Sequence, residues 1–433
     1  MIWNPEYEQM DRARLGQLQT RRLRSTVEWA YERVPRYREE MDARGVKPRD
    51  VRSVEDVRLL PFTDKAALRD TYPFGMFAVP MEQVVRLHSS SGTTGKPIVV
   101  GYTRGDINTW SELCARISAL AGVLPTDRAQ MAFLYGMFTG GWGMHYGLER
   151  LGATVVPAGS GNTERHLMMM QDFGTTALIS TPSYALYMAE VGEGMGIDFS
   201  KLPLRVGLFG GEPSGEGMRD EIERRLHIKA TDNYGLSEVM GPGVSGECEH
   251  QCGLHLAEDH FIFEIVDPDT GGPLPDGAEG ELVVTTLTKE AIPILRYRTR
   301  DLTSIDTSTC ECGRTSARMR KVRQRTDDML IIRGVNVFPS QIEDVLLEVE
   351  GVQPHYQIVV DRKGALDDIE VRIEVAEEIF PETMAQIVKF TKEVGDRLHA
   401  VLGLHAKVTL VESGSIERTA GKSKRVVDRR TME

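Results

Sequence analysis

Short β-rich runs alternate with longer amphipathic or polar stretches between residues 83 and 235, and this rhythm constrains the fold more than any other feature. Each run is rich in Val, Ile, Leu, Thr and aromatic residues, and the stretch after it has room for a helix. Strands that alternate with helices are typical of parallel sheets with crossover helices. The pattern therefore predicts an α/β fold with the parallel strands QMAFLY, ATVVPA, TALIST, RVGLFG and IKATDNY.

The pattern changes at His260, where alternating HFIFEIV is followed by the turn-rich stretch DPDTGGPLPDG and then by ELVVTTL. Two such runs around a turn rich in Gly and Pro indicate an antiparallel hairpin. We therefore expect a small β subdomain after the parallel part.

A third region begins near Asp327. Ser340 and Glu343 are predicted to form a capping box ahead of apolar residues at helical spacing. Two strands, a helix and a strand follow, which together predict a separate α+β module. A chain of 433 residues is too long for one compact core, so we expect an N-terminal domain, residues 1–327, and a C-terminal domain, residues 328–433. The expected elements are strands at 356–361 and 369–375, a helix at 381–402 and the strand AKVTLVE, and the apolar helix residues are Ile342, Val345, Leu346 and Val349.

The composition excludes several classes of protein. Hydrophobic residues make up 41% and charged residues 27% of the chain, and no apolar run reaches the length of a membrane span. The first residues lack the apolar core of a secretory signal, so a cytoplasmic protein is expected. A net charge of −12 argues against a general nucleic-acid surface, because phosphate contacts need clustered Lys and Arg.

The segment LHSSSGTTGKP is the most informative motif. Its small and hydroxyl residues can bring backbone amides and hydroxyls close to phosphate oxygens, and Lys96 adds positive charge. The segment is not a Walker A loop, because Ser90 stands where that motif needs Gly, and Pro97 stands where it needs Ser or Thr. A flexible linker is disfavoured, because both neighbours, VVRL and IVVGYT, have the pattern of strands. We predict an anion-binding loop.

The five cysteines include two close pairs. Cys248 and Cys252 are separated by three residues, and Cys310 and Cys312 are separated by one residue. Two such pairs on either side of a predicted hairpin fit a tetrahedral zinc site. Four thiolates are one choice of ligands, and His250 and His255 lie near the first pair. Buried free thiols are the alternative.

Four motifs in order along the chain give a resemblance to a known family. SSSGTTGKP, DNYGLSE, YRTRDL and RTAGKSKR resemble the phosphate loop, the central adenylate motif, the ribose motif and the C-terminal lysine segment of the adenylate-forming superfamily. YGMFTGGWGMHYG, FGGEP and DDMLIIRGVNVFP are similar to segments of its phenylacetate-CoA ligase family. The resemblance implies the adenylate-forming enzyme fold, with a mobile C-terminal domain.

The implied activity is that of an AMP-forming acid–thiol ligase. An aryl acid, with phenylacetate the first choice, would react with ATP and Mg²⁺ to give an acyl-adenylate and pyrophosphate, and coenzyme A would then take the acyl group. Glu238 matches the magnesium ligand of the family, and a carboxylate suits this hard cation. Lys422 matches the lysine that offsets charge in the adenylation transition state. Arg325 and Asp327 match the segment of the interdomain hinge, with Asp327 as the hinge residue, so rotation of the small domain would separate the two half-reactions.

The resemblance also implies the remaining contacts. Asp301 would accept hydrogen bonds from the ribose hydroxyls, and Tyr234 would stack beside the adenine. Gly210, Gly211, Glu212 and Pro213 would border the nucleotide and the acyl group. The residues expected to bind ATP or AMP are Ser89, Ser90, Ser91, Gly92, Thr93, Thr94, Gly95, Lys96, Gly211, Glu212, Pro213, Asp232, Asn233, Tyr234, Gly235, Ser237, Asp301 and Arg325.

An aromatic and glycine-rich stretch is the candidate acid pocket. Tyr135, Phe138 and Trp142 are spaced as on a buried helix, but the glycines among them argue against a helix and in favour of a pocket. Core packing is the alternative. One pocket side chain can change the preferred acid, so indoleacetate, benzoate and aminobenzoate types stay open. The expected pocket residues are Tyr135, Phe138, Gly140, Gly210 and Gly235.

The resemblance also selects among the metal ligands. Family members with a Cys-x-Cys pair resemble this chain at Cys248 and at the His of the Gly-Leu-His phrase, His255. We therefore expect a structural Zn²⁺ bound by Cys248, His255, Cys310 and Cys312, with Cys252 as a spare thiol. We also expect a homodimer of an enzyme of aromatic acid catabolism. The alternatives are an adenylating enzyme that loads a carrier protein and a non-catalytic nucleotide-binding protein.

Overall fold

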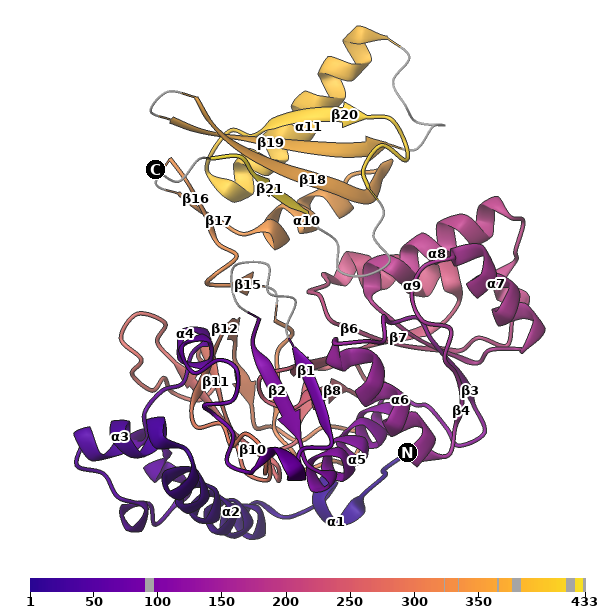
Figure 1. Cartoon of the computed structure of the whole chain (residues 1–433). Helices are drawn as coiled ribbons and strands as arrows, with labels where there is room; N and C mark the ends of the chain where they lie inside the picture. The colour runs from indigo at the N-terminus through magenta and orange to yellow at the C-terminus, as the bar shows by residue number, and fades with distance from the viewer. Residues whose placement is uncertain are drawn as a thin grey trace. The chain divides into compact units, whose positions relative to one another are not determined.

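The computed structural model describes residues 1–89, 97–322, 324–333, 335–363, 366–375, 383–417 and 425–430 (Figure 1). The chain forms two compact units. The first contains residues Met1–Ser180, Asp198–Gly211 and His227–Lys321, and the second contains Thr181–Ile197, Glu212–Leu226 and Val322–Glu433.

The core of the first unit is a nine-stranded sheet with the order β13-β14-β9-β8-β7-β6-β5-β3-β4. Its strands from β7 to β4 are parallel to their neighbours. The predicted parallel α/β arrangement is therefore confirmed, and the central strands β5 and β6 are buried along their whole length, as expected of a sheet covered on both faces. The parallel strands are β3 (Arg128–Met131), β4 (Thr154–Val156), β5 (Ala177–Ser180), β6 (Val206–Gly210) and β7 (Lys229–Leu236).

Antiparallel strands extend this sheet and form a second one. The sheet continues from β7 through four short antiparallel strands. In the second sheet β10 pairs with β11, and β11 pairs with β12, so the predicted hairpin after His260 is confirmed. The strands are β8 (Gly241–Glu247), β9 (Leu254–Leu256), β13 (Ile305–Asp306), β14 (Arg318–Met319), β10 (Phe261–Val266), β11 (Gly280–Thr286) and β12 (Tyr297–Thr303).

A third, two-stranded hairpin holds both ends of the predicted phosphate loop. β1 (Arg86–Ser89) pairs antiparallel with β2 (Val99–Tyr102), and Ser89 lies opposite Val99. Both predicted flanking strands are therefore present, while residues 90–96 between them lie outside the described part of the chain. The helices of the first unit are α1 (Pro5–Glu8), α2 (Arg12–Arg33), α3 (Pro35–Ala43), α4 (Lys65–Asp70), α5 (Arg104–Leu120), α6 (Thr139–Leu151) and α7 (Thr163–Asp172).

The glycine-rich stretch after Tyr135 forms helix α6, so the expectation that its glycines argue against a helix was wrong. An added Cβ would lie 2.5 Å from the Trp110 side chain at Gly143 and 2.3 Å from the Cys114 side chain at Gly147. The glycines therefore let α6 pack closely on α5. This tertiary contact outweighs the low helix propensity of glycine.

The second unit contains the C-terminal α+β region. Its sheet has the order β20-β19-β18-β21, and helices α10 and α11 pack against it around a common apolar core. Helix α11 starts at the N-cap Thr383, which accepts a hydrogen bond from the Gln386 N–H, and ends at Gly403 with a φ of +70°. The elements are α8 (Pro182–Gly194), α9 (Glu216–Leu226), β15 (Gln324–Arg325), β16 (Leu330–Ile332), β17 (Val335–Val337), α10 (Pro339–Leu347), β18 (Val352–Lys363), β19 (Leu366–Val375), α11 (Met384–Leu402), β20 (Lys407–Val411) and β21 (Val426–Asp428).

The predicted capping box at Ser340 and Glu343 was wrong. Helix α10 begins two residues earlier than predicted, with Phe338 as N-cap in place of Ser340 and Pro339 in the first turn. The Gln341 side chain accepts a hydrogen bond from the Phe338 N–H at 3.0 Å, which closes the first turn. Glu343 is instead buried in the domain core.

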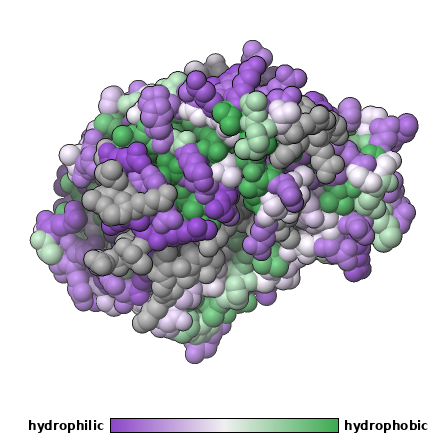
Figure 2. Space-filling view, turned by 90° about the horizontal axis from the view of Figure 1, so that it is seen from above, coloured by the Kyte–Doolittle hydropathy of each residue, from purple (hydrophilic) through white to green (hydrophobic). Residues whose placement is uncertain are grey.

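Polar and apolar residues are interspersed on the face shown in Figure 2. Among the described residues, no helix is both long and apolar enough to cross a bilayer.

Candidate active site

The carboxyl ends of β6 and β7 bring together two motifs predicted to contact the nucleotide. Gly210, the last residue of β6, pairs with Asn233 of β7. An added Cβ at Gly210 would lie 2.6 Å from the Asn233 carbonyl oxygen, so a side chain has no room there. Gly211 follows with a φ of +87°, which suits glycine and turns the chain out of the sheet. Ligands of open α/β sheets bind at this edge.

The turn after β7 carries Ser237 and Glu238. An added Cβ at Gly235 would lie 1.9 Å from the Gly241 carbonyl oxygen, because the chain doubles back tightly into β8. The Ser237 Oγ lies 2.8 Å from Oγ1 of Thr139, the first residue of α6. Glu238 is only 7% exposed. The predicted magnesium ligand therefore lies next to the segment predicted to bind the acid.

Tyr234 and Asp301 form a direct hydrogen bond. The Tyr234 hydroxyl donates to the Asp301 Oδ2 at 2.5 Å, and the Asp301 carboxylate is buried. Asp301 lies in β12, whereas Tyr234 lies in β7, so the contact joins the two sheets. The structure thus brings together the residues predicted to face the adenine and the ribose.

Asp232 and Asn233 are held by the sheet itself. The Asp232 N–H donates to the Glu247 carboxylate at 2.9 Å, and the Lys321 Nζ lies 3.8 Å from the Asp232 carboxylate. The Asn233 side chain donates to the Phe209 carbonyl at 2.6 Å. These contacts fix the end of β7 from which Tyr234 projects.

The predicted acid pocket is a half-exposed aromatic segment before and inside α6. The Tyr135 hydroxyl lies 3.0 Å from the His145 Nδ1, and its ring packs edge-on against Trp142 at 5.1 Å. Burial raises the pKa of Tyr135 to about 12. Leu134 and Met137 beside it are 60% and 53% exposed. Apolar surface of this kind suits an aromatic ligand.

The start of the phosphate loop lies beside this segment. The Ser89 N–H donates to the Met137 carbonyl at 3.3 Å, and the His88 Nδ1 lies 3.1 Å from the same oxygen. The loop residues Ser90, Ser91, Gly92, Thr93, Thr94, Gly95 and Lys96 lie outside the described residues.

The second unit contains the other predicted residues. The Glu212 carboxylate accepts a hydrogen bond from the Ser183 N–H at 2.8 Å, and Pro213 follows it in the chain. The Arg325 Nε donates to the Asp327 carboxylate at 2.9 Å, so the predicted hinge residue is paired within its own segment. Lys422 lies outside the described residues.

Two buried carboxylates hold the chain on either side of residues 418–424. Glu374 accepts hydrogen bonds from the Gly414 and Ile416 N–H groups at 3.1 and 2.8 Å. On the other side, the Arg425 guanidinium lies 3.3 Å from the Glu343 carboxylate and 4.4 Å from the centre of the Tyr356 ring. Both contacts anchor the chain to the C-terminal sheet and its helices.

Lys289 and His88 were missed by the sequence reasoning. Lys289 is 3% exposed, and its Nζ lies 4.3 Å from the centre of the Tyr102 ring without a hydrogen-bond partner among the described residues. Burial lowers the pKa of Lys289 to about 8, and the charges of Asp106 and Glu238 oppose this shift. The His88 Nε2 is likewise buried and lacks a partner in the part of the chain that the structure describes. A single Lys in a loop, or a single His within a strand, gives no such signal in a sequence.

Tyr102 connects Lys289 with the Glu238 turn. Its hydroxyl donates to the Met240 carbonyl at 2.8 Å, two residues after Glu238. Its ring stacks on Trp110 at 4.7 Å and meets His88 edge-on at 5.6 Å. We call Glu238, Lys289, Tyr102 and His88 the unpaired cluster, because His88 and Lys289 each bury a polar atom that has no hydrogen-bond partner among the described residues.

A separate cluster gathers the predicted metal ligands. One donor atom each from Cys248, His255, Cys310 and Cys312 lies within 4.8 Å of the other three. The Cys248 and Cys310 sulfurs are 3.8 Å apart, and the Cys312 sulfur is 3.4 Å from the His255 Nε2. Tetrahedral zinc with ordinary bond lengths would separate two sulfurs by about 3.8 Å and a sulfur and a nitrogen by about 3.6 Å. The observed separations fit such an ion.

The second nitrogen of His255 is also fixed. Its Nδ1 lies 3.0 Å from the Ser316 Oγ, a contact of the kind that orients metal-binding histidines. Burial, and then the charges of Arg314 and Arg318, lower the pKa of His255 to about 3. The imidazole is therefore neutral, as a metal ligand must be.

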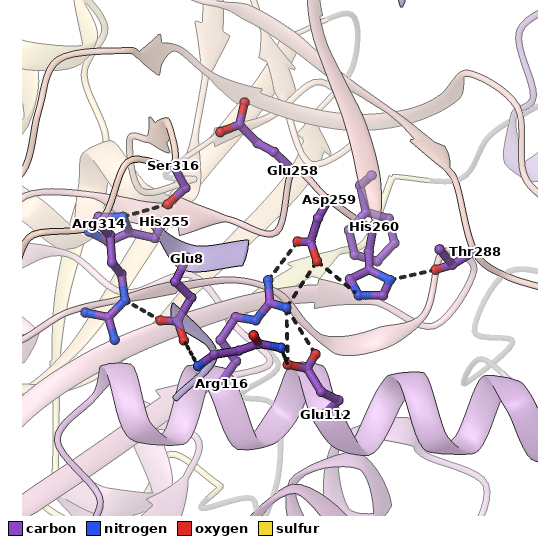
Figure 3. A network of polar contacts seen from close by, with 12 residues as sticks. Glu8, Glu112, Arg116, His255, Glu258, Asp259, His260, Thr288, Arg314 and Ser316 are labelled. Carbon is purple, nitrogen blue, oxygen red and sulfur yellow. Dashed lines mark hydrogen bonds and ion pairs between the residues drawn. The ribbon is translucent and has the colours of Figure 1, made fainter. Parts of the chain in front are cut away.

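A network of buried charges lies next to this cluster (Figure 3). The Arg116 guanidinium donates to the Asp259 carboxylate at 2.7 Å and to the Glu112 carboxylate at 3.2 Å. The Arg314 Nε donates to the Glu8 carboxylate at 2.5 Å. His260 lies between Asp259 and the Thr288 hydroxyl, at 3.2 and 2.7 Å. We call Glu8, Glu112, Arg116, Asp259, His260 and Arg314 the paired network.

Comparison with known proteins extends along the whole chain. The model of the AMP-binding enzyme family matches residues 28–287, and that of the AMP-binding enzyme C-terminal domain matches residues 334–430. Phenylacetate-coenzyme A ligase of Thermus thermophilus is 49% identical over 99% of this chain and 100% of its own. Phenylacetate-coenzyme A ligase of Escherichia coli is 50% identical over 100% of this chain and 99% of its own.

A solved structure agrees with these matches. The crystal structure of 2-hydroxyisobutyryl-CoA ligase in the postadenylation state, in complex with R3-HIB-AMP, has a TM-score of 0.93 to this chain. The two share 30% identity, and the match covers 99% of this chain and 92% of that chain.

Proposed function

This chain belongs to the AMP-binding enzyme family, and from that premise we propose that it is an AMP-forming phenylacetate-coenzyme A ligase. Phenylacetate and ATP would give phenylacetyl-adenylate and pyrophosphate, and coenzyme A would then take the acyl group and release AMP. The observation that carries the proposal is the near-half identity to phenylacetate-coenzyme A ligases along the full chain.

The nucleotide would bind along the ends of β6, β7 and β12. The Asp301 carboxylate would accept the ribose hydroxyls, and the Tyr234 hydroxyl, which already donates to it, would keep it oriented. Gly210 and Gly211 would let the backbone approach the adenine, because neither position carries a side chain. The hydrogen bond between the Tyr234 and Asp301 side chains supports the assignment of these two residues to the nucleotide site.

The Glu238 carboxylate is suited to Mg²⁺. It is buried beside Ser237, and hard cations prefer carboxylate oxygens while keeping phosphate and water ligands. A magnesium ion held there would neutralise the charge that develops on the leaving pyrophosphate. The protein would contribute the fixed position of the carboxylate, set by the tight turn at Gly235.

Zn²⁺ is the proposed ion at the cysteine and histidine cluster. One donor atom from each of the four residues lies within 4.8 Å of the others, and four protein ligands would leave no position for a substrate on a tetrahedral ion. The role would be structural: the ion would tie β9 to the segment of residues 310–316. Purified protein should contain about one zinc per chain, and much less than that would refute the site.

The aryl acid would lie against Tyr135 and Phe138. Exposed Leu134 and Met137 extend this apolar surface, and Gly140 avoids a clash with the Phe138 ring. A panel of arylacetates, benzoates and aminobenzoates, followed by AMP release that requires both ATP and coenzyme A, tests the substrate. We expect phenylacetate to have the highest kcat/KM, and no turnover with any arylacetate would refute it.

Lys422 is the proposed adenylation residue, delivered by a C-terminal domain that begins near Asp327. Its ammonium would bridge the α-phosphate and the attacking carboxylate. Lys422→Ala should abolish acid-dependent pyrophosphate exchange and leave thioester formation from supplied phenylacetyl-adenylate intact. Equal loss of both half-reactions would contradict this role.

A carrier protein is the alternative acceptor for the acyl group. Assays with coenzyme A and with a phosphopantetheinylated carrier separate the two acceptors, and we expect turnover with coenzyme A alone. We further propose a homodimer, which sedimentation would test, and a reaction in the cytoplasm.

A further inference from the structure

Cys252 lies beside the metal cluster without belonging to it. Cys252 is exposed, whereas Cys248 and Cys310 are buried. Its sulfur lies 3.4 Å from the Cys310 sulfur. The four-donor set is nevertheless complete without Cys252. A spare, accessible thiol is therefore held in contact with a proposed zinc ligand.

Arg318 fixes the position of this thiol. One guanidinium nitrogen donates to the Cys252 Sγ at 2.8 Å and to the Cys252 carbonyl at 3.0 Å. The other nitrogen donates to the Asp306 carboxylate at 2.9 Å. Because Arg318 is itself buried and anchored, it keeps the Cys252 sulfur directed toward Cys310.

We propose that Cys252 is a modification site for hydroperoxides, which oxidise it and couple it to Cys310 as a disulfide that removes Cys310 from the metal cluster. Oxidant-sensitive cysteines are accessible and lie next to a second, resolving cysteine, and Cys252 meets both conditions. The disulfide depends only on the two thiols. Metal release rests on the zinc site proposed above.

The chemistry balances in two steps. The Cys252 sulfur attacks the hydroperoxide, the O–O bond breaks, and the products are a sulfenic acid on Cys252 and the alcohol, or water if the oxidant is hydrogen peroxide. The Cys310 sulfur then attacks the sulfenic sulfur, and the S–O bond breaks. Hydroxide leaves and becomes water by taking up the Cys310 thiol proton, or a proton from solvent when Cys310 is bound to zinc as a thiolate. Two thiols lose two electrons, and the hydroperoxide gains them.

The other cysteines are poor first targets. Cys114 is fully buried in α5, and its thiol donates to the Pro242 carbonyl at 3.3 Å. Cys248 is 1% exposed. Cys312 is partly exposed, but its sulfur contacts the His255 Nε2 and would be bound to the ion. A hydroperoxide should therefore react first at Cys252.

The test treats the zinc-loaded full-length protein with a few equivalents of hydrogen peroxide. Two quantities are measured, the disulfide by peptide mass spectrometry without reduction, and free zinc with a chromogenic chelator. We expect a Cys252–Cys310 disulfide that forms together with zinc release, and both should reverse when dithiothreitol and zinc are added.

Cys252→Ser is the decisive variant, and Cys114→Ser is the matched control. Cys252→Ser should keep the zinc content of the parent and release zinc at least tenfold more slowly under peroxide, whereas Cys114→Ser should behave as the parent. Arg318→Gln should slow disulfide formation.

Three outcomes would overturn the proposal. The first is zinc loss from Cys252→Ser before oxidation, which would make Cys252 a zinc ligand. The second is an equal rate of zinc release in the parent and in Cys252→Ser. The third is a disulfide that does not include Cys252. Protein that forms the disulfide but never contained zinc would refute only the zinc site and leave the modification site standing.

Discussion

The paired network and the unpaired cluster bury charge in opposite ways. In the paired network each charged side chain has a partner of opposite charge, for example Arg116 with Asp259 at 2.7 Å and Arg314 with Glu8 at 2.5 Å. In the unpaired cluster the Lys289 ammonium and the His88 Nε2 are buried without a hydrogen-bond partner among the described residues. Both regions lie in the first unit.

This difference separates stability from function. A buried ion pair loses stability when one partner is removed, because the other charge remains in the core. A buried charge without a partner costs stability in the free protein and is retained when a ligand supplies the missing partner. We therefore expect substitutions in the paired network to change folding, and substitutions in the unpaired cluster to change nucleotide chemistry.

The largest effect is expected from Arg116→Leu, which leaves the Asp259 and Glu112 carboxylates buried without their partner. The free energy of unfolding should fall by about 3–5 kcal/mol, measured by urea denaturation. Lys201→Met is the control, because Lys201 pairs with Asp198 where both side chains are exposed, and it should leave the free energy of unfolding nearly unchanged. Equal losses of stability in the two variants would contradict the claim that the buried ion pairs of the paired network stabilise the fold.

Glu238→Gln should act on the reaction instead. Loss of the carboxylate should slow acid-dependent pyrophosphate exchange roughly 10²- to 10³-fold, an effect of the size seen when charge stabilisation in an active site is removed. The urea midpoint should stay near that of the parent. Glu112→Gln is the matched control, with lower stability and an unchanged exchange rate. A reversed pattern in the two variants would contradict the assignment.

The pH dependence of stability should report His260. Burial lowers the pKa of His260 to about 4 despite the nearby Asp259, while Arg116 and Arg22 favour the same direction and Glu112 opposes it. Below pH 6.5 the unfolded chain binds a proton that the folded chain does not. The free energy of unfolding should therefore fall by about 3 kcal/mol between pH 6.5 and pH 4.

His260→Gln provides the control for this measurement. Its stability should fall less steeply over the same interval, because glutamine does not titrate. Parallel curves for the parent and the variant would show that other groups cause the loss.

Lys289→Met is expected to change the free energy of unfolding least, and the direction of that change shows whether the buried ammonium stabilises or destabilises the fold. Removing an ammonium without a hydrogen-bond partner should raise the free energy of unfolding by about 1 kcal/mol. It should also weaken MgATP binding about tenfold by calorimetry, because positive potential near Glu238 is lost. Lys321→Met, which removes a partner of Asp232 and Glu247, should instead destabilise the fold. If Lys289→Met lowers the free energy of unfolding and leaves the affinity for ATP unchanged, Lys289 stabilises the fold and has no part in nucleotide binding.

The sequence predicted those parts of the fold that depend on local periodicity. The parallel strands, the hairpin after His260 and the C-terminal elements follow from alternation and helical spacing. Helix α6 could not be predicted, because the close approach of Trp110 and Cys114 that requires its glycines is a tertiary contact. The predicted capping box was wrong for a similar reason. Glu343 lies in the core, where it accepts a hydrogen bond from the Tyr356 hydroxyl and pairs with Arg425.

The residues of the candidate sites could be predicted only where they belong to a sequence motif. The four-donor set was selected by spacing and family resemblance, and its donor atoms lie within 4.8 Å of one another. Lys289 lies in no motif. His88 lies at the start of the phosphate-loop segment, but that segment does not reveal its unpartnered nitrogen, because its burial arises from packing against Tyr102 and Trp110. Unpartnered polar atoms become visible only when coordinates are known.

Helix α6 also sets limits for anyone who wishes to engineer the substrate range. One face, with Gly143 and Gly147, has no room for a side chain against α5. The opposite stripe, Trp142, His145, Tyr146 and Glu149, is at least partly exposed. Libraries that vary this stripe together with Tyr135 would test the proposed acid pocket, whereas substitutions at Gly143 and Gly147 should prevent α6 from packing on α5.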